Sequence, residues 1–159
     1  MVIRIGKKSD FPRLVQIYKL FFKKHNIFQQ DGRKVINYLQ QQIKENELLV
    51  FEDEKDGKLK GALFIVKIGQ SSDGKHTLWK YRHFAFKNDS VGSLLLREAE
   101  KYVRKQSKTA KVELTIAENE RGIDFYKNNG YKQEAALSHH YRFGETCFIL
   151  SKAFSIITK

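Results

Sequence analysis

Apolar residues are grouped along the chain in two different periods. Seven short stretches are rich in apolar and β-branched residues, several of them in strict alternation with polar ones, which favours strands over residues 2–7, 48–51, 59–68, 77–86, 111–117, 137–143 and 146–152. In four other stretches the apolar residues recur every three or four positions, as on one face of a helix. These predict helices over 9–24 and 31–43, one of about four turns from Val91, and a short one between Asn119 and Gly130.

Small and polar residues predict where several of these elements begin and end. Ser9 and Asn119 stand where helix N-caps are expected, because their side chains can accept a hydrogen bond from a first-turn N–H. Gly130 follows the short helix as its C-terminal stop. Gly144 and Glu145 predict a two-residue type II′ hairpin between the last two strands.

The resulting order of elements is β-α-α-β-β-β-α-β-α-β-β. The strand at 77–86, the helix after it and the strand at 111–117 form a βαβ unit, so these two strands are expected to be parallel. We predict a mixed sheet with helices on both faces, and because the sequence shows no internal repeat and no proline-rich linker, a single domain over residues 1–159.

Composition narrows the class of protein. The chain has 159 residues with a hydrophobic fraction of 41%, enough for a buried core without metal or disulfide support. No apolar run approaches the roughly 18 residues of a membrane span, and the N-terminus lacks the features of a secretory signal. The single cysteine, Cys147, excludes an internal disulfide and suits a reducing compartment. We therefore expect a cytoplasmic location and no membrane partner.

The charge is strongly positive, with 30 basic and 18 acidic residues and a formal net charge of +12. Such an excess attracts polyanions, such as nucleic acid, a phosphorylated cofactor or an acidic protein, although it also describes an ordinary lysine-rich surface. A basic stripe follows the helix after Val91, through Arg97, Lys101, Arg104, Lys105 and Lys108. Since no motif that reads RNA or DNA accompanies it, nucleic acid is not the partner we expect.

The turn at 87–93 is the clearest candidate binding site. An apolar strand ends at Phe86, a short polar turn follows, and a helix begins directly after it. The first N–H groups of a helix lack intrahelical partners and the helix dipole is positive there, so such a turn binds anions. We predict that Ser90 caps this helix. The alternative is a plain capped turn without a ligand.

Two segments of the sequence resemble the GNAT superfamily, the acyl-CoA-dependent N-acetyltransferases. The first is the run NERGIDFYKNNGY, in which Asn119, Phe125, Tyr126, Gly130 and Tyr131 match a characteristic family segment. The second is the start of the helix at Val91-Gly92-Ser93, which is similar to the helix after the family's pyrophosphate-binding loop. The resemblance implies a mostly antiparallel sheet of six to seven strands with a central parallel pair.

The resemblance also implies acetyl-CoA as cosubstrate. Its pyrophosphate would lie at the turn and its pantetheine arm along the preceding strand. The implied cofactor-binding residues are Phe84, Ala85, Phe86, Lys87, Asn88, Asp89, Ser90, Val91, Gly92, Ser93, Asn119, Phe125 and Tyr126. The family loop usually carries an Arg or Gln first and two small residues later. Here Lys87 takes the first place, Ser90 replaces a glycine and Gly92 is retained.

Two catalytic residues are predicted. The resemblance implies that Tyr126 gives a proton to the departing CoA thiolate. The strand before the turn carries no carboxylate, and His83 is the candidate base, with an ordinary pKa near 6.5. The alternative for His83 is a packed strand histidine, and Glu52, Asp53 and Glu113 are weaker candidates. No metal site is expected, because adjacent His139 and His140 face opposite sides of a strand and only one could join Cys147.

The sequence therefore predicts an N-acetyltransferase in which the amine of an unidentified acceptor, a small molecule or a protein, attacks the thioester directly. We expect a monomer or a homodimer. The alternative function is a binding protein on the same fold that has lost turnover and uses its basic surface for nucleic acid or an acidic partner.

Overall fold

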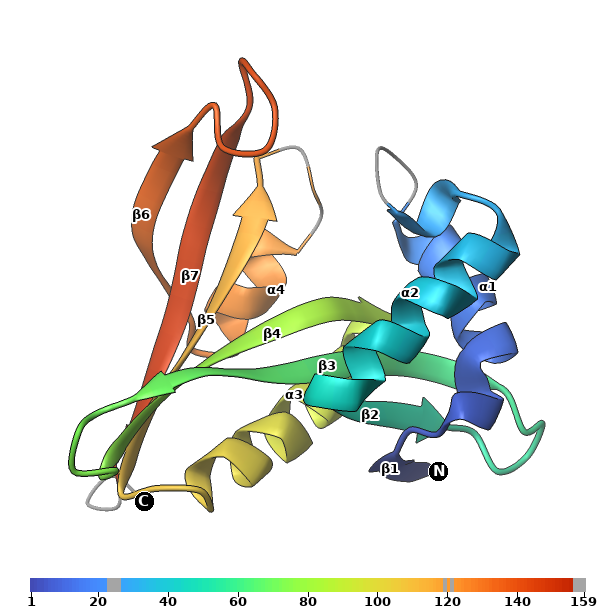
Figure 1. Ribbon diagram of the computed structural model, residues 1–159, viewed down its shortest axis with the longest axis horizontal. Coiled ribbons are helices and arrows are strands. Elements are labelled where there is room, and N and C mark those ends of the chain that lie inside the picture. The colour runs from blue at the N-terminus through green and yellow to red at the C-terminus, as the bar shows by residue number, and fades with distance from the viewer. Residues whose placement is uncertain (23–26, 119, 121, 156–159) are drawn as a thin grey trace. The chain divides into compact units, whose positions relative to one another are not determined.

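The structure is a computed structural model that describes residues 1–22, 27–118, 120 and 122–155. The chain divides into two compact units (Figure 1), which are described separately. The first unit comprises Met1–Val66 and Arg82–Lys101, and the second comprises Lys67–Tyr81 and Tyr102–Lys159. The expectation of a single domain stays a prediction.

The described elements follow the predicted order. The strands are β1 (Val2–Ile5), β2 (Glu47–Glu52), β3 (Leu59–Gln70), β4 (His76–Phe86), β5 (Thr109–Ala117), β6 (Lys132–Ser138) and β7 (Thr146–Ser155). The α-helices are α1 (Phe11–Phe21), α2 (Gly32–Glu45), α3 (Asp89–Arg104) and α4 (Ile123–Asn128), and short 3-10 turns cover Lys8–Asp10 and Ile27–Gln29. In the described part of the chain no helix combines the length and apolar character that crossing a membrane requires.

The strands form a seven-stranded mixed sheet in the order β1-β2-β3-β4-β5-β7-β6. The pair β4–β5 is parallel, with His76 opposite Thr109 and Lys80 opposite Glu113, which confirms the predicted βαβ unit. The described pairs β1–β2, β2–β3, β5–β7 and β6–β7 are antiparallel.

Helices pack on both faces of β3 in the first unit. Ala62 and Phe64 belong to a buried cluster with residues of α1 and α2, such as Leu14 and Leu39. Gly61, the residue before Ala62, faces α3 instead, and a Cβ on this glycine would lie 2.6 Å from Leu95 Cδ1. Neighbouring residues of a strand face opposite sides, so the predicted two-sided packing is confirmed within this unit.

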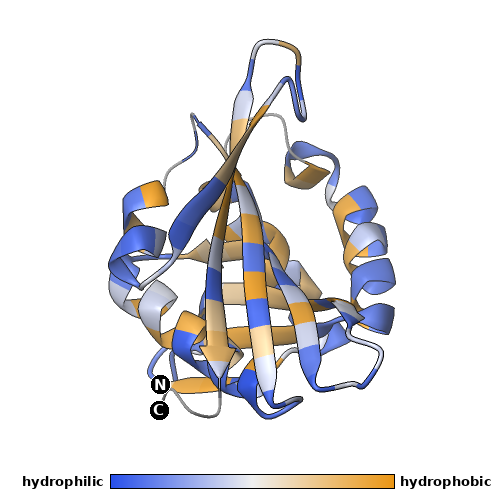
Figure 2. Cartoon of the chain, turned by 90° about the vertical axis from the view of Figure 1, so that its left-hand side faces the viewer, coloured by the Kyte–Doolittle hydropathy of each residue, from blue (hydrophilic) through white to orange (hydrophobic). Residues whose placement is uncertain are grey.

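In the second unit, β5 shows the predicted alternation. Ala110, Val112, Leu114 and Ile116 are buried, whereas the residues between them are half-buried. Figure 2 shows the same alternation of hydrophobic and hydrophilic segments on strands that face the viewer. β5 pairs with β7 along its whole length, from Thr109 opposite Ser155 to Ala117 opposite Cys147.

Three predicted boundaries are wrong. Ser9 is not an N-cap, because Lys8–Asp10 form a 3-10 turn and α1 begins at Phe11. Gly122 occupies the N-cap of α4 with a φ of +116°, so this helix begins at Ile123, later than predicted; Asn119, its expected cap, lies outside the described residues. The last hairpin is wider than two residues, since β6 ends at Ser138 and β7 begins at Thr146. The His139 ring accepts a hydrogen bond from Gly144 N–H (2.8 Å), which closes this longer connection.

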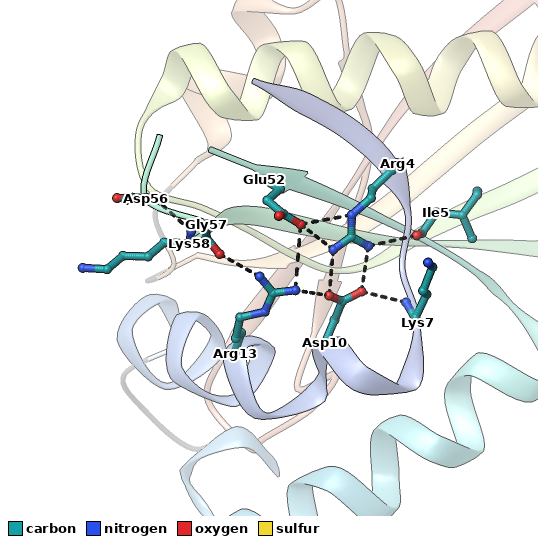
Figure 3. A network of polar contacts seen from close by, with 9 residues as sticks. All are labelled: Arg4, Ile5, Lys7, Asp10, Arg13, Glu52, Asp56, Gly57 and Lys58. Atoms are coloured by element: carbon teal, nitrogen blue, oxygen red, sulfur yellow. Dashed lines mark hydrogen bonds and ion pairs between the residues drawn. The ribbon is translucent and has the colours of Figure 1, made fainter. Parts of the chain in front are cut away.

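A buried carboxylate determines the start of α1 (Figure 3). Asp10 is 1% exposed, and both of its carboxylate oxygens accept hydrogen bonds from the Arg4 guanidinium, at 2.8 and 2.9 Å. Arg13 and the Lys7 backbone N–H also donate to it. Glu52 on β2 accepts from Arg4 in turn, at 3.1 Å from Nε. The network ties β1, β2 and α1 together, and the hydrogen bonds from Arg4 lower the pKa of Asp10 to about 2.

Replacing this carboxylate is expected to destabilise the protein. We predict that Asp10→Asn lowers the free energy of unfolding by about 2 kcal/mol at pH 7, from the difference between the ordinary aspartate pKa and the lowered one. A carboxyl group whose pKa is lower in the folded protein than in the unfolded chain adds to the free energy of unfolding at any pH above its unfolded pKa. This added stability is lost as pH falls, here between about 4 and 2. The difference from wild type should therefore shrink over that range in urea unfolding.

Asp31→Asn is the matched control, because Asp31 occupies the N-cap of α2 without a side-chain capping hydrogen bond. It should change the free energy of unfolding by less than about 0.5 kcal/mol. Equal effects of the two substitutions would contradict the role assigned to the Asp10 network.

Candidate active site

The turn between β4 and α3 lies in the first unit and is held by three hydrogen bonds. Lys87 N–H donates to Lys60 O (2.8 Å), which keeps the end of β4 against β3. The Asn88 side-chain oxygen accepts from Val91 N–H (3.0 Å), and the Asn88 backbone carbonyl accepts from Gly92 N–H (3.0 Å). Asn88 is therefore the N-cap of α3, and the helix begins at Asp89, two residues earlier than predicted.

The predicted cap at Ser90 is wrong for a geometric reason. Because β4 ends at Phe86 and Lys87 is tied to β3, Asn88 is the residue that precedes the first helical turn, and Ser90 lies inside that turn. The side chains of Lys87, Asn88, Asp89 and Ser90 are exposed, whereas Val91 and Gly92 are buried. The exposed start of this helix thus carries one lysine at the positive end of the helix dipole, an arrangement that suits an anion.

The last residues of β4 pack tightly beneath this turn. Phe84 and Phe86 have ring centroids 4.9 Å apart, and Phe86 lies 5.1 Å from Phe21 of α1. A Cβ on Gly61 would lie 3.2 Å from Ala85 O and 3.0 Å from Val91 Cγ1. Glycine at this position lets α3 approach the strands closely, so the start of the helix is fixed relative to the end of β4.

His83 lies in an aromatic cluster, which we call the His83 cluster and define by Tyr18, Phe28, Tyr38, Phe64 and His83. The four rings have centroids between 5.0 and 6.3 Å from the imidazole. Tyr38 Oη and His83 Nε2 are 2.6 Å apart and share a hydrogen bond. Burial lowers the pKa of His83 to about 4, and the nearby Arg82 charge adds to the effect. His83 is therefore uncharged at neutral pH.

Sequence reasoning did not single out Tyr38, the hydrogen-bond partner of His83. A signal was present, because Tyr38 follows Val35 by three positions and so lies next to the apolar face of α2. Its partner His83 is 45 residues away in the sequence, and helical periodicity carries no information about that contact.

Tyr126 lies in the second unit, on α4. It is 8% exposed, its ring lies 5.2 Å from Phe125 and 5.9 Å from Tyr131, and burial raises its pKa, with the Glu120 carboxylate adding to the rise. The phenol is therefore protonated throughout the neutral range. Gly130 ends α4 with a φ of +90°, as predicted for its C-terminal stop. Asn119 lies outside the described residues.

Two of the three weaker base candidates have hydrogen-bond partners within the fold. Glu52 belongs to the Asp10 network, and Asp53 accepts a hydrogen bond from Lys55 N–H (3.0 Å) in the β2–β3 turn. Glu113 is half-buried on β5.

The residues considered for a metal site have other surroundings. His139 is stacked on Phe143 with ring centroids 4.3 Å apart, and Cys147 is buried. In the described part of the chain, no three His, Cys, Asp or Glu residues are grouped as a metal site requires.

Comparisons with known proteins agree with this architecture. The model of the acetyltransferase (GNAT) family matches residues 12–131. The structure of ribosomal-protein-alanine N-acetyltransferase from Brucella melitensis has a TM-score of 0.69 and 16% identity, covering 97% of this chain and 100% of that one. The aminoglycoside 6′-N-acetyltransferase from Enterococcus faecium has a TM-score of 0.73 and 13% identity, covering 96% and 97%. An aminoglycoside 6′-N-acetyltransferase complexed with coenzyme A has a TM-score of 0.73 and 14% identity, again covering 96% of this chain and 97% of that one. A sequence search among curated proteins found no match.

The N-cap residue of α3 can be identified by measuring how substitutions change the free energy of unfolding. Asn88→Ala removes the side-chain hydrogen bond to Val91 N–H and should lower the free energy of unfolding by about 1 kcal/mol in urea. Ser90→Ala leaves that hydrogen bond in place and should cost less than about 0.5 kcal/mol. A larger loss in Ser90→Ala than in Asn88→Ala would show that Ser90 caps the helix after all.

Proposed function

The chain belongs to the acetyltransferase (GNAT) family, and on that basis we propose that it transfers the acetyl group of acetyl-CoA to a primary amine by direct attack on the thioester. The observation that carries the proposal is the start of α3. A capped helix N-terminus stands at the end of β4 with an exposed lysine beside it, within the residues that the family model matches.

These residues fit the phosphates of the cosubstrate. In the proposal the turn Lys87–Ser93 holds the pyrophosphate: the backbone N–H groups of Asp89 and Ser90, at the start of the helix, point at it and Lys87 supplies a positive charge. The main chain at Phe84, Ala85 and Phe86 lies beside the pantetheine arm. Asp89 is exposed, and its carboxylate must turn toward solvent, since it would repel the phosphates if it faced them.

Tyr126 is the proposed general acid. As the acceptor nitrogen attacks the acetyl carbon, the carbon–sulfur bond breaks and its electron pair goes to sulfur, which then takes the Tyr126 proton. The raised pKa of Tyr126 keeps that proton in place until the thiolate forms. Phe125 and, by family resemblance, Asn119 belong to the same cofactor-binding segment.

His83 is the proposed acceptor of the amine proton, acting through Tyr38. The nitrogen loses a proton once it has become part of the tetrahedral intermediate. Tyr38 Oη takes that proton while its own passes along the 2.6 Å hydrogen bond to His83 Nε2. Because the pKa of His83 is about 4, the imidazole then gives the proton up readily to water.

The acceptor remains a primary amine of unspecified source. Two proteins of similar fold bear the names of acetyltransferases that act on aminoglycosides or on an alanine of a ribosomal protein, at 13% and 16% identity. At this level the likeness concerns the fold. We propose that the reaction takes place in the cytoplasm on a small molecule or a protein amine, by a monomer or homodimer.

The proposal is tested by calorimetry with acetyl-CoA and by thiol release over a panel of amines. We expect saturable binding below about 1 mM acetyl-CoA and turnover of at least one amine. Tyr126→Phe should lower kcat by roughly 100-fold with the acetyl-CoA Kd unchanged. Tyr102→Phe, a tyrosine on α3 packed against Trp79, is the matched control and should leave both values as in wild type.

Absence of binding at millimolar acetyl-CoA would contradict the enzyme proposal. Binding without turnover of any amine would instead indicate a binding protein on an acetyltransferase fold.

A further inference from the structure

The connection between β6 and β7 is closed by contacts among its own residues. His139 Nδ1 accepts a hydrogen bond from Gly144 N–H at 2.8 Å, and the His139 ring is stacked on Phe143 with centroids 4.3 Å apart. At the base of the connection, Arg142 donates to the Glu145 carboxylate at 2.8 Å. His139, Phe143 and Gly144 are exposed, and Phe143 is 92% exposed. Water therefore has access to the hydrogen bond that closes the connection.

The closed connection has two unfavourable features. His139 has a φ of +54°, a left-handed conformation that is uncommon for a residue with a side chain. Glu145 is buried, and its Oε1 atom has no hydrogen-bond partner in the part of the chain that the structure describes. Both features raise the free energy of the closed form. The hydrogen bond from Gly144 and the stacking on Phe143 offset them, so closure depends on the His139 ring.

The hydrogen bond specifies the protonation state of this ring. Because a backbone N–H can only donate, Nδ1 of His139 is the unprotonated nitrogen, and the proton of the neutral ring is on Nε2. An imidazolium carries a proton on both nitrogens and cannot accept from Gly144 N–H. Two N–H groups would then face each other where the hydrogen bond now lies. Only the neutral ring is compatible with the closed connection.

Other titratable and charged groups lie around the connection. Within it are His140 and the ion pair of Arg142 with Glu145. At the end of β5 are Glu118, which accepts a hydrogen bond from the N–H of the first residue of β7 at 3.2 Å, and Glu120, whose pKa is raised by partial burial and further by the Glu145 charge. Among the described residues, none of these five groups is hydrogen-bonded to the His139 ring, so its own protonation decides whether it can accept from Gly144.

We propose that the connection between β6 and β7 is a pH-sensitive switch, which is closed while His139 is neutral and opens when His139 is protonated. Histidines ordinarily have a pKa near 6.5, so the closed form is favoured above that range and is lost as pH falls through it. Opening lets His139 leave its left-handed conformation and brings the unpartnered Glu145 oxygen to water. Glu120, on which the Glu145 charge acts, adds in turn to the raised pKa of Tyr126. The switch therefore changes the electrostatics beside the proposed general acid.

Hydrogen exchange of the Gly144 amide in the full chain tests the switch. Its protection factor, corrected for the intrinsic pH dependence of exchange, is compared at about pH 8 and about pH 5.5, on either side of the ordinary histidine range. We expect the protection to be about fivefold or more higher at the higher pH, as for the loss of one hydrogen bond. The ¹⁵N chemical shifts of the His139 ring should show the Nε2–H form at the higher pH.

Three variants separate the His139 proton from the shape of the connection. Asparagine carries an acceptor oxygen at the same δ position, tolerates a left-handed φ and does not titrate, so His139→Asn should keep the Gly144 amide protected at both pH values. His139→Ala removes the acceptor and should lower the protection at both. His140→Asn alters the neighbouring exposed histidine and is the matched control, which should keep the wild-type pH response.

Protection of the Gly144 amide that is equal at both pH values in the wild type would overturn the proposal. So would an Nδ1–H form of His139 at the higher pH. A wild-type pH response in His139→Asn would also overturn it, because another group would then be responsible. None of these measurements depends on acetyl-CoA binding or on turnover, so the switch and the proposed acetyl transfer can fail separately.

Discussion

The hydrogen bond between Asn88 and Val91 N–H decides where α3 begins, and the geometry of the first unit depends on that position. Lys87 fixes the end of β4 to β3, Asn88 caps the helix, and Gly61 lets Leu95 approach β3. These three features together fix the first turn of α3 relative to the end of β4. This fixed geometry supports the proposal that the turn binds an anion, because donors that are already oriented need no rearrangement when a ligand arrives.

Desolvation is the second constraint, and it acts in each unit separately. In the first unit it keeps His83 uncharged, and in the second it keeps the Tyr126 phenol protonated. Both groups are therefore held in the neutral forms that the proposed reaction needs at its start, one as a weak proton acceptor and one as a proton donor. Elsewhere in the first unit a buried charge is retained only with several partners, as Asp10 shows with Arg4, Arg13 and the Lys7 N–H.

The periodicity of apolar residues was sufficient to predict the order of elements, the parallel pair and the packing of helices on both faces of β3. It could not predict Ser9, Ser90 or the last hairpin correctly, because those boundaries depend on hydrogen bonds between separate elements. The carboxylate of Asp10 accepts hydrogen bonds from Arg4, and the Lys87 backbone N–H donates to the Lys60 backbone carbonyl. The His139 ring accepts a hydrogen bond from Gly144 N–H. The His83 cluster was only partly predictable, since Tyr38 meets His83 across 45 residues of sequence. Tyr126 is buried, as periodicity predicts, and only the resemblance to the family motif singles it out as the proposed general acid.

The central claim is that the start of α3 binds the phosphates of acetyl-CoA. Titration of ¹⁵N-labelled protein with acetyl-CoA, followed by amide chemical shifts, tests it most directly. The account predicts saturable shifts that are largest at the backbone amides of Asp89 and Ser90, reproduced by CoA without its acetyl group. Shifts confined to other segments, or amides in this turn that do not respond at millimolar acetyl-CoA, would contradict it.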